Sequence, residues 1–334
     1  MRHAMIIMLA GFAIFLLASG TAFAGGAEEA EGATLTYAEV NVEADPITQG
    51  ALHFATRLAE LTDGRFGVEV VGGGALGGHE TTMRLTETGT IEMTRTNAFF
   101  LAEAGVEVME ALSLPFMFES KDHAWEVMQG EIGAEVLNEI NDADLGYYAL
   151  GFYIAPPRHY FFRDAEVTSI DDMSGLSVRV PAGPLADATE AFGASATTIE
   201  FGELYSALET GVVDAAEQPV KGYYTQGFYE VAPYFTYSNH QVDPTVVLIN
   251  RDLWESLDSD DQEAFRVAFE ESAEHYRALE AEERVAFEEE LAEQHGVRFF
   301  DVDNPDEWSD AAAHLYDQFP AYAELIERIQ AAAQ

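Results

Sequence analysis

The sequence predicts an α/β fold made of two units. Short runs rich in β-branched and aromatic residues alternate with longer runs whose apolar residues recur every three to four positions. The chain has 334 residues, a length that favours two domains over one. It has no cysteine, which excludes disulfides and thiolate metal sites, so its stability must come from an ordinary apolar core.

The N-terminus has the pattern of a secretory signal peptide. A basic start precedes an apolar run from Ala4 to Ala18, and Ala22-Phe23-Ala24 then offers a small-x-small cleavage site. An uncleaved helical anchor is the alternative, but about 15 apolar residues fall short of the roughly 20 that span a bilayer. We therefore expect a cleaved signal peptide at residues 1–24, a flexible leader at 25–33 and export to the periplasm.

The first α/β unit follows the leader. Its elements are expected, in order, as a strand at 35–42, a helix at 47–61, a strand at 66–71, a helix at 80–87 and a strand at 91–94. The helical segments carry apolar residues at three- to four-residue spacing, and the strands are short and rich in β-branched residues. This alternation is typical of βαβ units.

A second α/β unit begins near residue 155. Its elements are expected as a strand at 177–180, a helix at 185–192, a strand at 197–200 and a helix at 201–210. Pro181 ends the first of these strands, and Gly211 stops the last helix.

Two further elements follow the second unit. A strand is expected at 246–250, and a long helix at 260–293. The apolar face of that helix consists of Phe265, Phe269, Tyr276, Leu279, Phe287 and Leu291.

The charge balance is strongly acidic. The net charge is −44, from 60 acidic and 16 basic residues, which makes nucleic acid an improbable partner. Only two of the bases are lysines, Lys121 and Lys221. Such a surface repels itself in dilute buffer and is better tolerated where salt screens it, so a saline habitat is a hypothesis for this protein.

Several motifs match catalytic or cofactor-binding patterns incompletely or without supporting context. Gly72-x-Gly74-x-x-Gly77 follows a strand and precedes a helix, as a dinucleotide-binding loop does. His79-Glu80 begins like a zinc-binding helix, but Met83 stands where the second ligand belongs. No serine or cysteine nucleophile motif is present. We expect no catalytic residue, no metal and no cofactor, and a periplasmic enzyme that uses the glycine loop remains the alternative.

Acidic residues are missing from selected stretches around arginines. None lies between Asp144 and Asp164, a stretch that contains Arg158, and none lies in the stretch 176–185, which contains Arg179. A local positive centre in so acidic a chain is suited to capturing an anion, although buried strands also lack acids. Arg179 is the sharper candidate because it lies inside an apolar strand, where an arginine needs a carboxylate partner from the protein or from a ligand.

Three segments carry a resemblance to a known family. They are Ser169–Pro181 (SIDDMSGLSVRVP), Phe192–Ala194 (FGA) and Glu203–Pro219 (ELYSALETGVVDAAEQP). In this order and spacing, the chain resembles the solute-binding proteins of tripartite ATP-independent periplasmic (TRAP) transporters, of the C4-dicarboxylate-receptor (DctP) type. The resemblance runs from about Leu35 to about Gln262.

The resemblance implies a fold and a domain division. The fold is two α/β lobes joined by hinge strands and a long lobe-spanning helix, which close on a ligand. We expect lobe I at 34–155 plus 245–334, including the long helix, and lobe II at 156–244.

The resemblance also implies a ligand site. Arg179 corresponds to the arginine that pairs with a ligand carboxylate, and Arg158 to a second arginine that many members direct at the same site. Gln218 stands where asparagine is frequent, which keeps the amide but lengthens the side chain. Four further residues fall at or near positions that line the cleft in relatives: Asn41, Asn97, Phe201 and His240.

The implied function is a non-enzymatic receptor that captures a small organic anion and delivers it to TRAP membrane subunits. C4-dicarboxylates, sugar acids and related carboxylates all suit an arginine clamp, and we expect a monomer. A sensory receptor for the same ligand remains a further alternative.

Overall fold

The computed structural model describes residues 33–181 and 183–332. The expected signal peptide and all but the last residue of the expected leader lie outside the described residues. Within the described part of the chain, no helix combines the length and apolar character that a membrane span requires.

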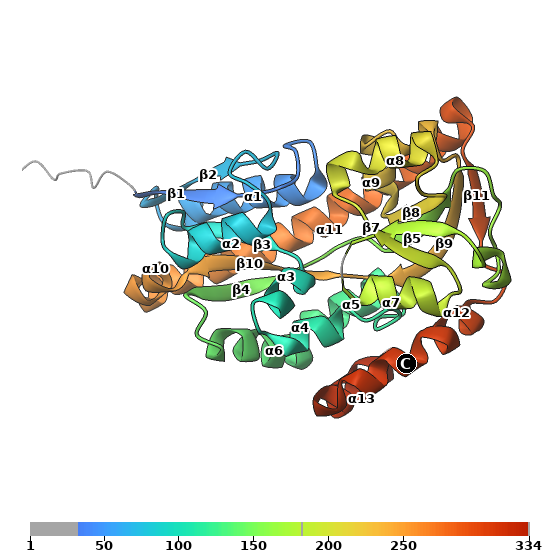
Figure 1. Cartoon of the computed structure of the whole chain (residues 1–334). Coiled ribbons are helices and arrows are strands. Elements are labelled where there is room, and N and C mark those ends of the chain that lie inside the picture. The colour runs from blue at the N-terminus through green and yellow to red at the C-terminus, as the bar shows by residue number, and fades with distance from the viewer. Residues whose placement is uncertain (1–32, 182, 333–334) are drawn as a thin grey trace, which may run out of the picture. The chain divides into compact units, whose positions relative to one another are not determined.

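One five-stranded sheet forms the centre of lobe I (Figure 1). Its strand order is β2-β1-β3-β10-β4, in which β1 is parallel to β2 and β3, and β10 is antiparallel to β3 and β4. The strands are β1 (Ala33–Ala38), β2 (Phe66–Val71), β3 (Met93–Thr96), β4 (Tyr147–Ile154) and β10 (Pro244–Asn250).

A six-stranded sheet forms the centre of lobe II, in the order β11-β9-β5-β8-β6-β7. The parallel trio β7-β6-β8 carries the βαβ alternation that the sequence predicts, and β5 runs antiparallel to β8 and β9. The strands are β5 (Arg158–Phe162), β6 (Ser177–Val180), β7 (Ser195–Thr198), β8 (Ala215–Gln218), β9 (Tyr234–Gln241) and β11 (Arg298–Asp301).

Two short segments carry the chain between the sheets. Residues 155–157 join β4 to β5, and residues 242–243 join β9 to β10. The two segments run side by side, because the backbone amide of Ala155 donates to the carbonyl of Asp243 at 3.0 Å. This pair of crossing segments is the hinge that the predicted fold requires.

The helix α11 (Ser259–His295) packs against both lobes. It begins where the Asp258 side chain accepts hydrogen bonds from two backbone amides of the first turn, and it ends at Gly296 in the left-handed conformation. Phe265 and Tyr276 pack into the core of lobe I, whereas Leu291 packs with the core of lobe II. The predicted long lobe-spanning helix is therefore confirmed (Figure 1).

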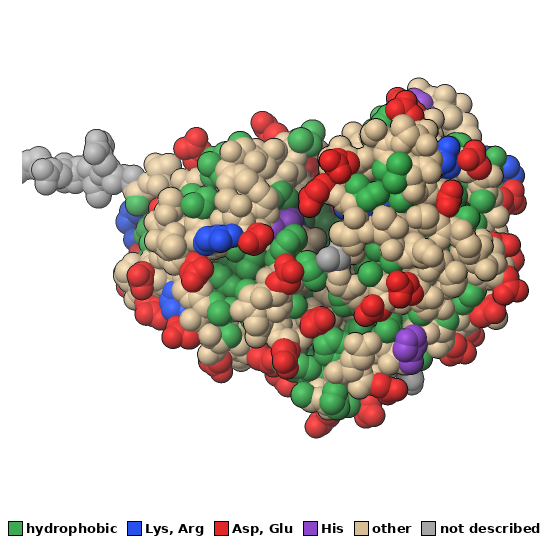
Figure 2. Space-filling model, in the orientation of Figure 1, with side chains coloured by type: hydrophobic (Ala, Val, Ile, Leu, Met, Phe, Trp, Pro, Cys, Tyr) green, Lys and Arg blue, Asp and Glu red, His purple; other side chains and the backbone are tan. Residues whose placement is uncertain are grey.

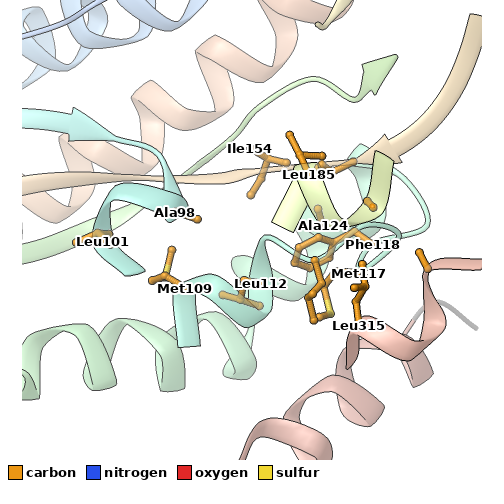
Figure 3. Packing of buried hydrophobic residues seen from close by; sticks show 14 of the residues in the cluster. Ala98, Leu101, Met109, Leu112, Met117, Phe118, Ala124, Ile154, Leu185 and Leu315 are labelled. Carbon is orange, nitrogen blue, oxygen red and sulfur yellow. The ribbon is translucent and has the colours of Figure 1, made fainter. Parts of the chain in front are cut away.

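The remaining helices cover the sheets and build a third cluster of buried residues. Figure 3 shows part of this cluster, in which side chains from lobe I meet Leu185 of lobe II and Leu315 near the C-terminus. The helices are α1 (Pro46–Leu61), α2 (His79–Glu87), α3 (Ala98–Glu103), α4 (Glu107–Leu112), α5 (Lys121–Met128), α6 (Glu131–Asp142), α7 (Pro184–Ala191), α8 (Leu204–Thr210), α9 (Val220–Thr225), α10 (Arg251–Ser256), α12 (Pro305–Ala312) and α13 (Ala323–Ala331).

The predicted elements differ from the structure mainly at their ends. The strand expected at 35–42 ends at Ala38, because the side chain of Glu39 turns inward to an arginine and accepts the backbone amide of Asn41. The strand expected at 91–94 is β3, two residues later. The strand expected at 197–200 is β7, two residues earlier, and the first three residues of the helix expected at 201–210 form a 3₁₀ turn.

One part of the expected domain division is wrong. Residues 245–334 were expected in lobe I, but β11 pairs in parallel with β9 and so completes the sheet of lobe II. The helix α11 leads the chain to that lobe, and the edge of β9 offers unpaired backbone groups there. The chain then returns, because His123 in α5 contacts the carbonyl of Ile329 in α13 at 3.0 Å.

The glycine-rich loop between β2 and α2 is a turn that needs glycine for its backbone. Gly73, Gly74 and Gly77 have φ angles of 70°, 67° and 111°, which residues with a Cβ rarely adopt. A Cβ on Gly72 would also lie 3.1 Å from the carbonyl oxygen of Asn41. Both observations explain the glycines without a nucleotide.

The acidic residues are spread over the surface of both lobes on the face shown in Figure 2, where basic side chains are few. The two lysines, by contrast, are largely buried and both contact α11. Lys121, from lobe I, pairs with Glu280, and Lys221, from lobe II, pairs with Glu283 at 2.7 Å. The long helix is thus tied to each lobe by one lysine.

Candidate functional site

Arg179 is held in place but pairs with no carboxylate of the described residues. It lies on β6 with only 6% of its surface exposed, and its Nε donates to the carbonyl of Ile199 at 2.9 Å. Within 33–181 and 183–332, no carboxylate forms a salt bridge with its guanidinium, and the terminal Nη atoms donate no hydrogen bond. Burial lowers the pKa of this guanidinium more than the charge of Glu217 raises it, and the charge of Arg158 adds to the lowering. An anion that binds the two Nη atoms would relieve this cost.

Phe201 lies close to this guanidinium. The Arg179 Cζ atom is 5.8 Å from the centre of the Phe201 ring, a cation–π distance. Phe201 is 42% exposed, and its ring packs edge-on against that of Phe228, with ring centres 6.0 Å apart. An exposed aromatic residue beside the Arg179 guanidinium offers an apolar surface for the body of a ligand.

Gln218 lies at the end of β8, where it pairs with His159 of β5. Its side chain is partly buried, and no described residue forms a hydrogen bond with its amide. A Cβ on Gly222 would lie 2.9 Å from the Gln218 Oε1, so glycine at 222 leaves the amide its space. The amide is therefore available for a polar ligand group.

Arg158 differs from Arg179 because a protein carboxylate neutralises it. Its Nε and Nη2 contact the two carboxylate oxygens of Glu217, the second at 2.8 Å, and Glu217 is fully buried. Burial alone would raise the pKa of Glu217, but Arg158 and His240 together outweigh it and hold the pKa below its usual value. The expected positive centre at Arg158 is therefore wrong, because the adjacent strand β8 brings an acid that lies far away in the sequence.

His240 also meets Glu217, from the other side. Its Nε2 is 3.8 Å from the carboxylate, too long for a hydrogen bond, and its Nδ1 lies 2.8 Å from Ser238 Oγ. The ring is fully buried and stacks on Tyr160 with centroids 4.3 Å apart. Burial lowers the pKa of His240 more than the neighbouring Glu217 raises it, so the imidazole is favoured in its neutral form. His240 is thus fully buried beside Glu217 and Tyr160 and exposes no surface to a ligand.

Asn41 and Asn97 lie together in lobe I, around a buried ion pair. Arg95 donates to Asn97 Oδ1 at 3.0 Å and to Asn41 Oδ1 at 3.1 Å. The same guanidinium makes a two-pronged pair with Glu39, at 2.8 and 2.6 Å, and is only 3% exposed. Burial opposes the charge of Arg95, but Glu39 overcomes it and raises the pKa. The two asparagines are thereby fixed as a polar wall.

The lobes approach each other at two points near these residues. Lys221 of lobe II donates to the carbonyl of Ala44 in lobe I at 3.2 Å. Gly183 at the start of α7 has φ 103°, and a Cβ there would lie 2.7 Å from the ring of Phe99 in α3. These contacts join lobe II to lobe I close in sequence to Asn41 and Asn97.

The sequence reasoning missed Glu39, Arg95 and Glu217. Each is a charged residue in or beside a short strand, as Arg179 is, although the neighbours of Arg95 in β3 are threonines. A charged residue in a strand indicates that a charge is buried, but it does not identify the residue of opposite charge that pairs with it. Across the described residues, no cluster of three or more histidine, aspartate or glutamate side chains is arranged to hold a metal ion.

Comparisons with known proteins agree with this arrangement. Residues 37–322 match the model of the DctP family, described as bacterial extracellular solute-binding protein, family 7. A solute-binding protein of Chromohalobacter salexigens is 31% identical over 83% of this chain and 83% of its own length. The C4-dicarboxylate-binding periplasmic protein DctP of Rhodobacter capsulatus is 25% identical over 91% of this chain and 92% of its own length.

A solved structure extends the likeness to three dimensions. A TRAP periplasmic solute-binding protein of Pseudomonas putida F1, with bound D-glucuronate, superposes with a TM-score of 0.83 and is 27% identical, covering 90% of this chain and 97% of its own. The family match spans both sheets, the hinge segments and α11. The chain therefore belongs to the DctP family of TRAP-type solute-binding proteins.

Proposed function

We propose that this protein is an exported receptor that captures a sugar acid by its carboxylate and delivers it to the membrane subunits of a TRAP transporter. The observation that carries the proposal is Arg179, a buried guanidinium whose Nε is fixed by a backbone carbonyl and whose two Nη atoms have no partner among the described residues. This geometry suits a two-pronged pair with a carboxylate. The ligand of the similar Pseudomonas putida protein, D-glucuronate, is an acid of this kind.

The surroundings of Arg179 suit the rest of such a ligand. Phe201 offers an aromatic face, and Gln218 offers an amide that can donate to or accept from a hydroxyl. Asn41 and Asn97 belong to the opposite lobe, so closure of the hinge would surround the ligand. Removal of water then strengthens the ion pair by lowering the local dielectric. In this proposal the protein acts as a monomer and catalyses no reaction, and the signal peptide at 1–24 is removed on export.

A thermal-shift screen tests this function. The mature protein, in moderate salt, is heated with D-glucuronate, D-galacturonate, succinate and neutral D-glucose. A ligand that binds only the folded state raises the melting temperature increasingly with concentration. We expect such a rise with the sugar acids and none with glucose. A rise with glucose, or no rise with any carboxylate, would contradict the proposal.

Lys221 is expected to support closure without touching the ligand. Lys221→Met removes the bond to Ala44 across the lobes as well as the pair with Glu283, and should weaken ligand affinity by roughly 3- to 10-fold. Lys121→Met is the matched control, since it loses the pair with Glu280 but no contact between lobes. Titration calorimetry with D-glucuronate compares the two. Equal affinities in both variants would show that Lys221 has no role in closure.

A further inference from the structure

A groove on lobe I is lined by residues of α2, of α3 and by the first residue of β4. Its volume is about 460 Å³, a size that suits a small organic molecule. None of the lining residues belongs to the set assigned to the carboxylate site. The groove is therefore a separate feature of lobe I.

The inner wall of the groove is apolar and aromatic. Met83 of α2 and Tyr147 of β4 are only 6% and 3% exposed, and Phe100 of α3 is partly buried. The Phe100 ring packs against the imidazole of His79, with centroids 5.0 Å apart. Burial lowers the pKa of His79 to about 3, with the charge of Arg95 adding to the effect, so this imidazole is neutral at neutral pH. The wall thus offers aromatic rings, whose faces attract cations.

The rim of the groove carries more negative than positive charge. Glu80, Glu87 and Glu103 are all exposed, and the one base among the lining residues is Arg84. Arg84 already pairs with Glu80 at 2.8 Å. Glu87 and Glu103 form no salt bridge with any described residue. Their two charges are therefore available to a cation from solution.

The Tyr147 hydroxyl is a second, independent indication of a ligand. This side chain lines the groove, is almost fully buried and forms no side-chain hydrogen bond with any residue in 33–181 or 183–332. Burial raises the pKa of its phenol, and the charge of Glu87 raises it further, so the hydroxyl lies within electrostatic reach of that rim carboxylate. Polar groups buried this deeply are generally matched by water or by a ligand.

The kind of cation follows from the spacing of the acids and from the aromatic wall. Across the described part of the chain, no three histidine, aspartate or glutamate side chains are grouped to hold a metal ion. An alkylated ammonium group is larger, and it can contact aromatic faces while carboxylates surround its charge at a greater distance. The groove therefore suits an organic cation better than a metal ion.

We propose that this groove is a second binding site, which takes a small organic ammonium ion whose charged head contacts Phe100 and Tyr147 between the carboxylates of Glu87 and Glu103. A hydroxyl on the ligand would exchange a hydrogen bond with the Tyr147 hydroxyl. The inference goes beyond the proposed function and does not depend on it, since no residue of the carboxylate site takes part.

An NMR titration of the mature wild-type protein with choline tests this site. Choline carries a quaternary ammonium and a hydroxyl, and 3,3-dimethyl-1-butanol is its uncharged counterpart of the same shape. Moderate salt screens weak attraction to the acidic surface as a whole. We expect saturable shifts of backbone amides in α2 and α3 with choline, and at least about tenfold weaker binding of the alcohol.

Matched variants locate the binding. Glu87→Gln/Glu103→Gln removes two rim charges and should weaken choline binding by about 3- to 10-fold. Glu270→Gln/Glu274→Gln removes the same charge from exposed positions of α11 and should leave the affinity unchanged. Tyr147→Phe keeps the ring but loses the hydroxyl, so it should weaken choline binding by about threefold. Tetramethylammonium, which has no hydroxyl, should bind this variant as it binds the wild-type protein.

The outcomes decide between a built site and general attraction to an acidic protein. Absence of saturable choline binding, or equal binding of choline and the alcohol, overturns the inference. Choline shifts spread over other elements, or equal losses in the two charge variants, overturn it as well. A loss confined to the groove variants supports it. A failure of every carboxylate in the thermal-shift screen would contradict the proposed function and leave this inference standing.

Discussion

Replacing Arg179 by alanine is expected to weaken binding of a sugar acid by tens- to thousands-fold. The change removes the cation that would pair with the ligand carboxylate in a site closed to water, which costs on the order of 2–5 kcal/mol. The folded protein should tolerate the change, because Arg179 forms no salt bridge within the described residues and burial already disfavours its charge. Titration calorimetry with D-glucuronate measures the loss of affinity.

Two other variants give this experiment its controls. Arg179→Lys keeps the charge but loses the planar fork, so it should recover only part of the affinity. Arg163→Ala removes a partly exposed arginine of the same lobe that lies 3.7 Å from Asp164, and it should leave affinity unchanged. Arg179→Ala with wild-type affinity would mean that the carboxylate binds elsewhere.

Replacing Glu217 by alanine is expected to lower the free energy of unfolding by about 3–5 kcal/mol. Breaking a buried ion pair from one side leaves the other charge without compensation. Here Arg158 would lose both carboxylate contacts while remaining between β8 and β9. Urea denaturation of the ligand-free protein measures the change.

A double variant separates lost pairing from lost packing. In Arg158→Met/Glu217→Leu both charges are removed together, and apolar side chains fill the space. Most of the stability lost in Glu217→Ala should return, because no unpaired charge remains. A single variant whose stability stays within about 1 kcal/mol of wild type would show that Arg158 finds another partner or reaches water.

Much of the fold could be predicted because its strands and helices have distinct periodicities. β2 and β6 lie where the sequence predicts them, and α11 exceeds its predicted length by one residue at its start and two at its end. The pairing of β11 with β9 could not be predicted. The pairing depends on where in space the long helix α11 ends. No local sequence pattern near residue 298 indicates which sheet edge lies at that place.

Residues of the site could be predicted where a charged residue stands inside an apolar stretch of the sequence, because that pattern indicates a buried charge. Arg179 stands out as an arginine in an apolar strand, and the structure places it beside Phe201. Arg158 was misread as a free charge because Glu217 is 59 positions away. Pairing across strands follows from register, which composition does not reveal.

The most direct test of the account compares D-glucuronate with D-glucuronamide, its neutral amide, by titration calorimetry on the mature wild-type protein. The two ligands have nearly the same shape, and only the acid can form an ion pair with Arg179. We expect saturable binding of the acid and at least about 100-fold weaker binding of the amide. Comparable affinities for the two ligands would contradict recognition through the carboxylate.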